Sequence, residues 1–564
     1  MSPELETTTD SRIERRALLI ATLAFVALCA VGAVGYRGFI EGDATNHYLI
    51  ARFAVDQPLN FVNVWGRPLT TLLYALPAQL GRDSGDIRAG VLATRALSIA
   101  IALLIAWITH RLAKGQNLRW PALAVVFVFA QPIFYVHAFS EMTEIPFALI
   151  LGAAFLAYQR RQWLVMAILV GLLPLGRPEG FGFIGITAAA LVWHRRWHWL
   201  PVLAIPFLAW NFAGYALTRD HGYAGPWYAW VKANWPYSAT SAYGSGYPFD
   251  FLIRLPLLVG FVVFPATLVG AYLALSNQAW RQSVRSWWQR NITRRPDPRG
   301  FPLDAPRTVA THNDSAPLTP SSPPPLLPPS DKPLHLPFWT AALPLLVLIG
   351  HTILWWRGWM GSNGGLRYLV ICTPFWALLT ARGWEWFFAS KPDELLSSSG
   401  LVGWFKNHPH AVAVVLSLTP LLITFTGVSY PNIPITQSET ADRVAGKIAD
   451  WWRSDPDLRR CYPRILSSLP TMSYYLDLDL SRPRHSAEPG KSGLRKRTPG
   501  TLLIWDPHLG ATNSDQNLCL TPDEIRSAGW ILVKRFDNKD LGGADWADVY
   551  LSPTDIDGAP TRLP

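Results

Sequence analysis

The stretch ALLIATLAFVALCAVGAVG, residues 17–35, decides the class of this protein. It is an unbroken apolar run long enough to cross a bilayer, since a hydrocarbon core about 30 Å thick needs roughly 20 helical residues. The run is longer than the apolar region of a secretory signal, and no clear small-residue cleavage site lies before the polar stretch that follows. We therefore predict an uncleaved first span. Directly after it, EGDATNHY (residues 41–48) places Glu41, Asp43 and His47 at the end of that span.

Similar apolar runs recur along the whole chain of 564 residues, of which 50% are hydrophobic and 16% charged. Long blocks of this kind, without periods of 3.6 or 2 residues, argue against a string of soluble domains. The fold class predicted is an α-helical polytopic membrane protein of about eleven transmembrane helices. Three of the predicted spans (144–158, 162–176 and 180–193) are short, so we expect them to be tilted, re-entrant or extended by their flanks. The spans predicted are 17–35, 88–109, 119–139, 144–158, 162–176, 180–193, 199–217, 251–275, 336–356, 367–389 and 410–429.

The net charge of +11 reflects membrane topology rather than nucleic-acid binding. Arg12, Arg15 and Arg16 precede the first span, which predicts a cytoplasmic N-terminus by the positive-inside rule. With that start, every loop assigned to the cytoplasm contains Lys or Arg, and the alternation holds over all eleven spans. We expect a multi-pass protein of a bacterial inner (plasma) membrane. The loops assigned to the cytoplasm are 110–119, 159–162, 194–198, 277–335 and 390–409.

Composition divides the chain into five parts. Residues 1–16 form a cytoplasmic N-terminus, 17–276 a transmembrane catalytic unit of about eight spans, and 336–430 three further spans. Between the two membrane units, residues 277–335 are basic and rich in Pro, which predicts a cytoplasmic linker. Residues 431–564 predict a small α/β domain, placed outside by the odd number of spans. Its expected strands are 464–469, 501–506, 530–536 and 547–552, and its expected helices are 440–454 and 521–529.

Unusual polar residues gather in the loops assigned to the outside. Ionisable groups beside apolar spans are energetically expensive, so their convergence on one face predicts a functional site there. The first outer loop also contains 44–55 and 68–80, which have apolar residues at helical spacing but are too short to span. We predict that both lie flat at the interface.

These outer motifs resemble the GT-C superfamily, the polytopic glycosyltransferases that use lipid phosphosugars and include protein O-mannosyltransferases and bacterial aminoarabinose transferases. The resemblance covers about residues 17–430. It implies transfer of a hexose or pentose, with inversion, from a polyprenyl-phosphate donor to a glycan, lipid or protein acceptor outside the cell, without nucleic acid as a partner. The motifs are the pair Glu41-Gly42-Asp43 after the first span, the flat helices, SEMTEIP (140–146), GRPEG (176–180), LRYLVICTPF (366–375) and the C-terminal domain.

Such a transfer needs a base for the acceptor proton and positive charge for the released phosphate. Asp43 is the predicted base, although an acid there is also a good cap for the helix 44–55. The resemblance leaves open whether Glu41 and Asp43 together hold a divalent metal, and the chemistry otherwise requires no cofactor. His47 is interpreted as a packing or hydrogen-bonding residue.

Four further residues are candidates. Glu141 and Glu144 are three residues apart and predicted to share one helix face, either as favourable acids at a helix start or as ligands of the acceptor or a metal. Arg177, between two apolar runs, is expected to pair with Glu179 or to bind phosphate. Arg367, followed by Tyr368, resembles the phosphate-binding arginine of the family, at a helix start that adds amide donors.

A transporter or flippase and an O-antigen-type ligase are the two alternatives to a transferase. A transporter or flippase of lipid-linked sugars should place polar breaks near mid-span and contain inverted repeats, and we find neither pattern in the sequence. An O-antigen-type ligase, which shares the donor chemistry, remains an alternative. Cys461 and Cys519 lie in the predicted outer domain and are expected to form a disulfide if that space is oxidising.

Overall fold

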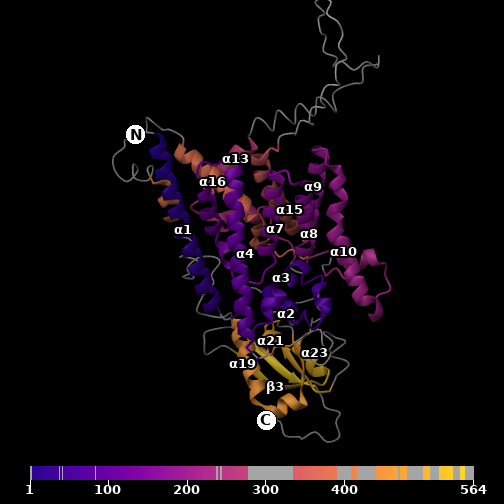
Figure 1. Cartoon of the computed structure of the whole chain (residues 1–564). Coiled ribbons are helices and arrows are strands. Elements are labelled where there is room, and N and C mark those ends of the chain that lie inside the picture. Colours follow the sequence, from indigo (N-terminus) through magenta and orange to yellow (C-terminus); the bar gives the residue numbers. More distant parts are fainter. Residues whose placement is uncertain are drawn as a thin grey trace, which may run out of the picture.

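The computed structural model describes residues 3–36, 38–40, 42–82, 84, 86–236, 239–241, 244–276, 334–389, 408–415, 440–467, 470–478, 499–507, 520–537 and 546–552. A layer of long helices occupies most of the molecule, and a small sheet-containing domain sits at one end of it (Figure 1). The N-terminus lies at the opposite end of the helical layer. The candidate residues must therefore be placed relative to these two ends.

Within the described residues, four helices are long and apolar enough to cross a membrane. They are Glu14–Gly35 within α1 (Pro3–Gly35), α4 (Ile87–Gly115), Trp197–Thr218 containing α10 (Leu200–Thr218), and α15 (Leu336–Arg357). A fifth crossing is formed by α12 (Asp250–Val259) and α13 (Phe264–Leu275), if this bent pair is one span. The chain is thus a multi-pass membrane protein. The number eleven stays a prediction, and the described part of the last predicted span ends at residue 415.

Several predicted spans are shorter or broken. The three predicted to be short are α7 (Glu144–Gln159), α8 (Trp163–Gly176) and α9 (Gly180–Trp193). The region 119–139 forms α5 (Pro121–Phe129) and α6 (Pro132–His137), and the region 367–389 forms the 3₁₀ helix η6 (Leu366–Cys372) followed by α16 (Thr373–Ala389). α12 and α13 meet at 109°. At that bend Gly260 has φ +102°, a conformation that glycine adopts without steric strain.

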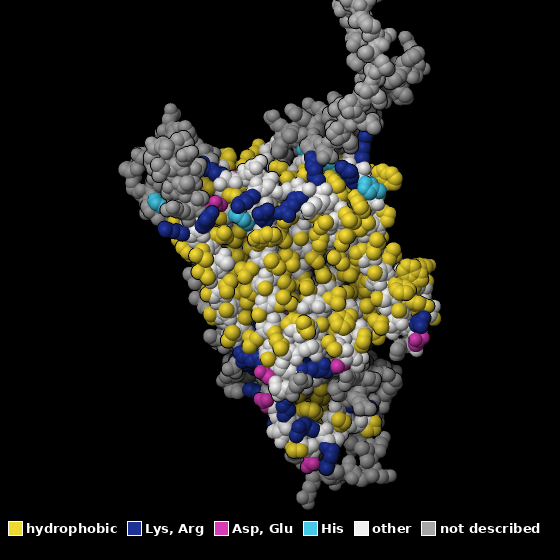
Figure 2. Space-filling model, viewed as in Figure 1, with side chains coloured by type: hydrophobic (Ala, Val, Ile, Leu, Met, Phe, Trp, Pro, Cys, Tyr) yellow, Lys and Arg dark blue, Asp and Glu magenta, His cyan; other side chains and the backbone are white. Residues whose placement is uncertain are grey.

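The surface of the helical layer agrees with a membrane-embedded protein. Hydrophobic side chains cover its middle, and Lys and Arg side chains line the rim nearest the N-terminus (Figure 2). α13 and α16 cross closely, since a Cβ on Gly270 or Gly383 would lie 1.8 Å from a backbone oxygen of the other helix. Small residues at such crossings allow the backbones of membrane helices to approach.

Two short helices lie between the long helices and the C-terminal domain: α2 (Gly42–Phe53) and α3 (Pro68–Ala78) (Figure 1). They match the two segments predicted to lie flat. Residues 58–61 form a 3₁₀ turn, η1 (Pro58–Phe61), between them. The loop after α10 contains three more short helical turns, η3 (Arg219–His221), η4 (Trp227–Ala229) and α11 (Trp230–Ala233), and η2 (Trp197–Trp199) precedes α10.

The C-terminal domain contains a four-stranded sheet of order β1-β2-β4-β3. β1 (Arg464–Ser467) and β2 (Thr501–Trp505) are parallel, whereas β4 (Trp546–Leu551) is antiparallel to both β2 and β3 (Ile531–Asp537). Each of the four observed strands begins within one residue of the start of a predicted strand. The helices are α19 (Thr440–Ser454), α20 (Pro456–Cys461), α21 (Pro470–Tyr475) and α23 (Pro522–Ser527).

Candidate active site

Asp43 lies in the first turn of α2 and forms an ion pair with Arg367 of η6, 324 residues away in the sequence. The Asp43 side chain is 30% exposed, whereas that of Arg367 is 9% exposed. Burial opposes ionisation of the carboxyl group, but the charges of Arg367, His47 and Arg177 outweigh it, so the pKa of Asp43 lies below its usual value. The predicted base and the predicted phosphate-binding arginine are therefore direct neighbours.

Glu144 joins the two candidate arginines. It begins α7, its side chain is fully buried, and its Oε1 lies 2.6 Å from Nη1 of Arg177 and 3.8 Å from Nε of Arg367. A single buried carboxylate thus lies between two guanidinium groups, and its negative charge lowers the electrostatic penalty of burying both of them.

Arg177 has a second carboxylate partner. Its Nη2 donates a hydrogen bond to Oε1 of Glu179 over 2.9 Å, and its Nη1 donates to the hydroxyl of Thr143 over 2.8 Å. Burial raises the pKa of Glu179, but Arg177 and His351 more than compensate, and this pKa lies well below its usual range. The predicted pairing of Arg177 with Glu179 is confirmed by this geometry, and it does not exclude a role toward phosphate.

His351 and Tyr368 complete the cluster. Nε2 of His351, on α15, lies 3.2 Å from Oε1 of Glu179, and the imidazole stacks on the Tyr368 ring with centroids 4.9 Å apart. The guanidinium carbons of Arg177 and Arg367 lie 5.3 and 5.4 Å from the centroid of the same ring, within cation–π range. His351 could not be predicted from the sequence, because one histidine in an apolar run carries no spacing signal.

His47 lies one turn beyond Asp43 on α2 and is buried. Burial lowers the pKa of His47 to about 4, against the opposing effect of the Asp43 charge. Its ring stacks near Trp65, with centroids 6.1 Å apart. Arg67, a buried residue with φ +61° at the start of α3, also acts electrostatically on His47. Its guanidinium carbon lies 5.7 Å from the centroid of the Trp235 ring. No pattern in the sequence marked Arg67 as a candidate site residue.

Glu141 lies apart from this cluster, and the prediction that it shares a helix face with Glu144 is wrong. α7 begins only at Glu144, so Glu141 belongs to the irregular segment between α6 and α7. Its carboxylate lies 3.6 Å from Nε of Arg95 and accepts a hydrogen bond from the Thr94 hydroxyl over 2.9 Å. Arg95 in turn donates to the carbonyls of Ala33 and Tyr36, at the end of α1. This contact holds the end of the first span against α4.

The described residues around Asp43 do not fit a metal site. Among the described parts of the chain there is no group of three or more His, Cys, Asp or Glu side chains able to hold a metal ion. The position beside the Asp43 carboxylate is taken by the guanidinium of Arg367. Glu41 lies outside the described residues, so its pairing with Asp43 stays a prediction.

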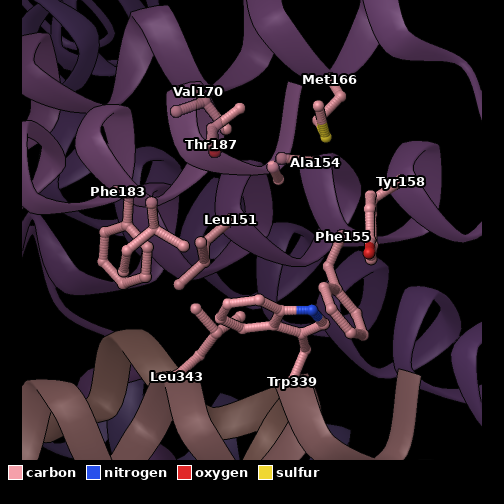
Figure 3. Close-up of a pocket in the computed structure, with 12 residues that line it drawn as sticks. Leu151, Ala154, Phe155, Tyr158, Met166, Val170, Phe183, Thr187, Trp339 and Leu343 are labelled. Atoms are coloured by element: carbon pink, nitrogen blue, oxygen red, sulfur yellow. The ribbon is translucent and has the colours of Figure 1, made fainter. Parts of the chain in front are cut away.

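An apolar pocket lies between α7, α8, α9 and α15 (Figure 3). Phe183 lies on one side of it, and Phe155 and Tyr158 lie on the other (Figure 3). The lining follows helical spacing on α9, from Phe183 to Ala190. Because a helix rises about 1.5 Å per residue, Phe183 lies about 6 Å and Ala190 about 16 Å along α9 from Glu179. The pocket is therefore separate from the charged cluster and extends away from it, into the apolar part of the helical layer.

The chain is similar to known proteins in structure but not detectably in sequence. No family model matches the sequence, and no curated protein sequence matches it. ArnT from Cupriavidus metallidurans in its apo state is similar in structure, with a TM-score of 0.51 and 12% identity, over 94% of this chain and 97% of ArnT. A crystal structure of ArnT from the same organism bound to undecaprenyl phosphate has a TM-score of 0.47 and 13% identity, over 95% of this chain and 99% of that one. The chain thus has the fold of ArnT, and at 12% identity the similarity is one of fold alone.

Proposed function

We propose that this protein is a membrane glycosyltransferase that moves a sugar from a polyprenyl-phosphate donor to an acceptor hydroxyl, with inversion at the anomeric carbon. The observation that carries the proposal is the ion pair of Asp43 with Arg367 inside a cluster of carboxylates and arginines, in a chain with the ArnT fold. The reaction takes place at the end of the helical layer where α2 and the C-terminal domain lie. The site is extracytoplasmic, and the membrane is the inner membrane of a bacterium.

Asp43 acts as the general base. Its carboxylate accepts the proton of the acceptor hydroxyl while the hydroxyl oxygen attacks the anomeric carbon. The bond from that carbon to the phosphate oxygen breaks, and the polyprenyl phosphate leaves with the bonding electrons. The proton ends on Asp43 and the negative charge ends on phosphate, so no oxidant, reductant or further reactant is needed.

Arg367 binds the donor phosphate and in doing so changes partner. In the structure its guanidinium is neutralised by Asp43 and lies near Glu144. A phosphate can accept two parallel hydrogen bonds from one arginine, which favours exchange of the Asp43 carboxylate for the phosphate. Loss of this cation would raise the pKa of Asp43 and make it a stronger base. Base activation is then coupled to the presence of the donor.

Arg177 and Tyr368 support the same phosphate. Glu144, Glu179 and Thr143 hold the Arg177 guanidinium in one orientation, so its charge is fixed beside the place where charge develops. Preorganised charge of this kind lowers the barrier, because no reorientation is required during the reaction. The Tyr368 ring lies against both arginines and limits the positions they can adopt.

The apolar pocket suits the tail of the donor. Its lining on α9 begins at Phe183, four residues after Glu179, and runs from there into the apolar layer. A lipid whose phosphate meets Arg177 and Arg367 can therefore place apolar chain in this direction, where burial of each CH₂ is favourable by about 0.8 kcal/mol.

The test is release of polyprenyl phosphate by purified protein in detergent or nanodiscs. Undecaprenyl-phosphate donors carrying a hexose or a pentose are offered with lipid, glycan and peptide acceptors, and the product is identified by mass spectrometry. We expect acceptor-dependent cleavage with at least one donor, and an inverted anomeric configuration. Transfer of intact donor between the leaflets of a vesicle, with no cleavage of any donor, would make the protein a transporter instead.

A further inference from the structure

We infer that the C-terminal domain positions α2, and hence Asp43, through a clamp formed by Arg52, Asp477 and Tyr474. The inference rests on the proposed function for its catalytic consequence, but the clamp itself is a structural property. Sequence composition alone left the role of this domain open.

An ion pair joins the domain to α2, between the fully buried Arg52 and Asp477, whose side chain is 35% exposed. Nε and Nη2 of Arg52 donate to the two carboxylate oxygens of Asp477 over 2.7 and 3.0 Å, and the Arg52 side chain is fully buried. The remaining nitrogen, Nη1, donates to the carbonyl of Ala78 at the end of α3 over 2.8 Å. A two-pronged contact of this kind fixes orientation as well as distance. α2, α3 and the domain therefore meet at one guanidinium.

The backbone of the domain is shaped for this contact. Asp477 follows α21 with φ +51°, a left-handed conformation that Asp and Asn tolerate better than other side chains. The amide of Leu478 closes the turn by donating to the Ser473 carbonyl over 2.8 Å. Leu476 and Leu478, on either side of Asp477, are buried in the core of the domain. The carboxylate is thus presented to α2 by a turn whose flanks are anchored in the domain.

Tyr474 makes the second half of the clamp. It is buried with residues of α2 and α3 rather than in the core of its own domain. Its ring packs edge-on against Phe39 at 4.8 Å between centroids and against Tyr48 at 6.1 Å. Phe39 lies four residues before Asp43, and Tyr48 and Arg52 lie five and nine residues after it. The domain thus contacts the chain on both sides of Asp43.

This arrangement has a consequence for the reaction. α2 is only 12 residues long, and a helix of this length is marginal without packing. The direction of Asp43 toward Arg367 and Glu144 depends on where α2 is held, and a displacement of about 1 Å can lower a rate about 100-fold. Arg52, Asp477 and Tyr474 are accordingly positioning residues.

Asp477→Asn tests the clamp, since Asn tolerates the same backbone conformation but removes the charge. Asp548→Asn is the matched control: Asp548 also accepts two hydrogen bonds from one arginine, Arg535 (2.6 and 2.8 Å), but that pair joins β4 to β3 within the domain. Tyr474→Leu provides a second variant if Asp477→Asn does not fold. Hydrogen exchange of peptides covering residues 42–53 is measured for each full-length protein, followed by kcat and KM for the donor.

We expect Asp477→Asn and Tyr474→Leu to speed exchange in α2 and to lower kcat about tenfold or more, with KM for the donor changed less than about threefold. Asp548→Asn should leave both α2 exchange and kcat near wild type, even if thermal stability falls. Unchanged α2 exchange in the two clamp variants, or equal kcat losses in Asp477→Asn and Asp548→Asn, would overturn the clamp. If wild-type protein cleaves no donor while the clamp variants still speed α2 exchange, the clamp stands and the proposed function fails.

Discussion

At the scale of single residues, the cluster is defined by how its charges are shared. Asp43, Glu144 and Glu179 face Arg177 and Arg367, and Glu144 lies within 4 Å of both arginines. Asp43, at 30% side-chain exposure, is the most accessible member, whereas Glu144 is fully buried. A substrate arriving from outside therefore meets Asp43 first, and Glu144 remains behind it as a fixed counter-charge.

Replacing Asp43 by Asn should leave the fold intact, because the two side chains are nearly isosteric, and should remove most transfer. Loss of a general base typically lowers a rate about 10²–10⁴-fold. Turnover of the purified variant, with thermal unfolding as the check on folding, measures the effect. A well-folded Asp43→Asn protein with near wild-type turnover would assign the base to another residue.

Replacing Arg367 by Ala should weaken donor use. A charged hydrogen bond to phosphate contributes about 1.5–3 kcal/mol, which corresponds to about tenfold or more in affinity. Arg367→Lys should recover only part of this, since the planar fork is lost. Arg357→Ala, an exposed arginine on the neighbouring helix end, is the control, and a similar KM for the donor in both Ala variants would contradict the assignment.

The buried His47 predicts a dependence of stability on pH. Its pKa is lowered to about 4 in the folded protein, against about 6.5 in an unfolded chain. The unfolded state therefore binds the proton more tightly, so stability is fully present above about pH 6.5 and falls as the pH is lowered toward about 4. Thermal unfolding across this range should show a larger loss for wild type than for His47→Asn, and parallel curves would contradict the prediction.

At the scale of elements, four of the charged cluster residues lie at the beginning or just after the end of a helix, whereas His351 lies within α15. Asp43 begins α2, Glu144 begins α7, Arg177 follows α8, and Arg367 lies in the first turn of η6. Positions of this kind suit an active site, because the spans fix them in space while their side chains still reach the boundary of the apolar layer.

Glu141 is predicted to serve α1 and α4 rather than the reaction. Glu141→Gln removes the carboxylate beside Arg95, which is 2% exposed, and an incompletely paired buried charge lowers the free energy of unfolding by about 1–3 kcal/mol. The folded variant should keep kcat within about twofold, whereas Glu144→Gln should lower it. Normal stability with a large loss of kcat in Glu141→Gln would return Glu141 to the acceptor or metal role.

At the scale of the whole molecule, the basic rim and the C-terminal domain lie at opposite ends of the apolar layer (Figures 1 and 2). If the rim faces the cytoplasm, as the positive-inside rule requires, then Asp43, α2 and the domain face outward. The site would then lie on the side predicted from the distribution of charges along the sequence.

Labelling of Cys461 tests this orientation. Cys461 is a free, exposed cysteine in the described structure, which gives the predicted disulfide no support. Its predicted partner, Cys519, lies outside the described residues. Intact cells treated with a membrane-impermeant thiol reagent should label Cys461, and more strongly after reduction if the disulfide forms. Lys114→Cys, in a protein whose Cys461 and Cys519 are serines, should label only after permeabilisation. The reverse pattern would place the domain inside and exclude an outward-facing site.

Neighbouring residues in the sequence were enough to predict most of the described helices and strands and to single out the candidate site residues. Apolar runs predicted many of the observed helices, and short apolar segments predicted the four strands. Asp43, Glu144, Arg177 and Arg367 stood out because charge beside an apolar span is costly, and Tyr368 stood out only as the neighbour of Arg367. These are local signals, carried by neighbouring residues.

Which charged side chains contact each other depends on the tertiary structure. Asp43 and Arg367 are 324 residues apart, and no local pattern specifies such a pairing. Glu141 and Glu144, three residues apart, have different arginine partners because a helix begins between them. His351 and the Arg52–Asp477 contact were missed for the same reason: single polar residues acquire a role only when packing brings distant segments together and burial makes a partner necessary.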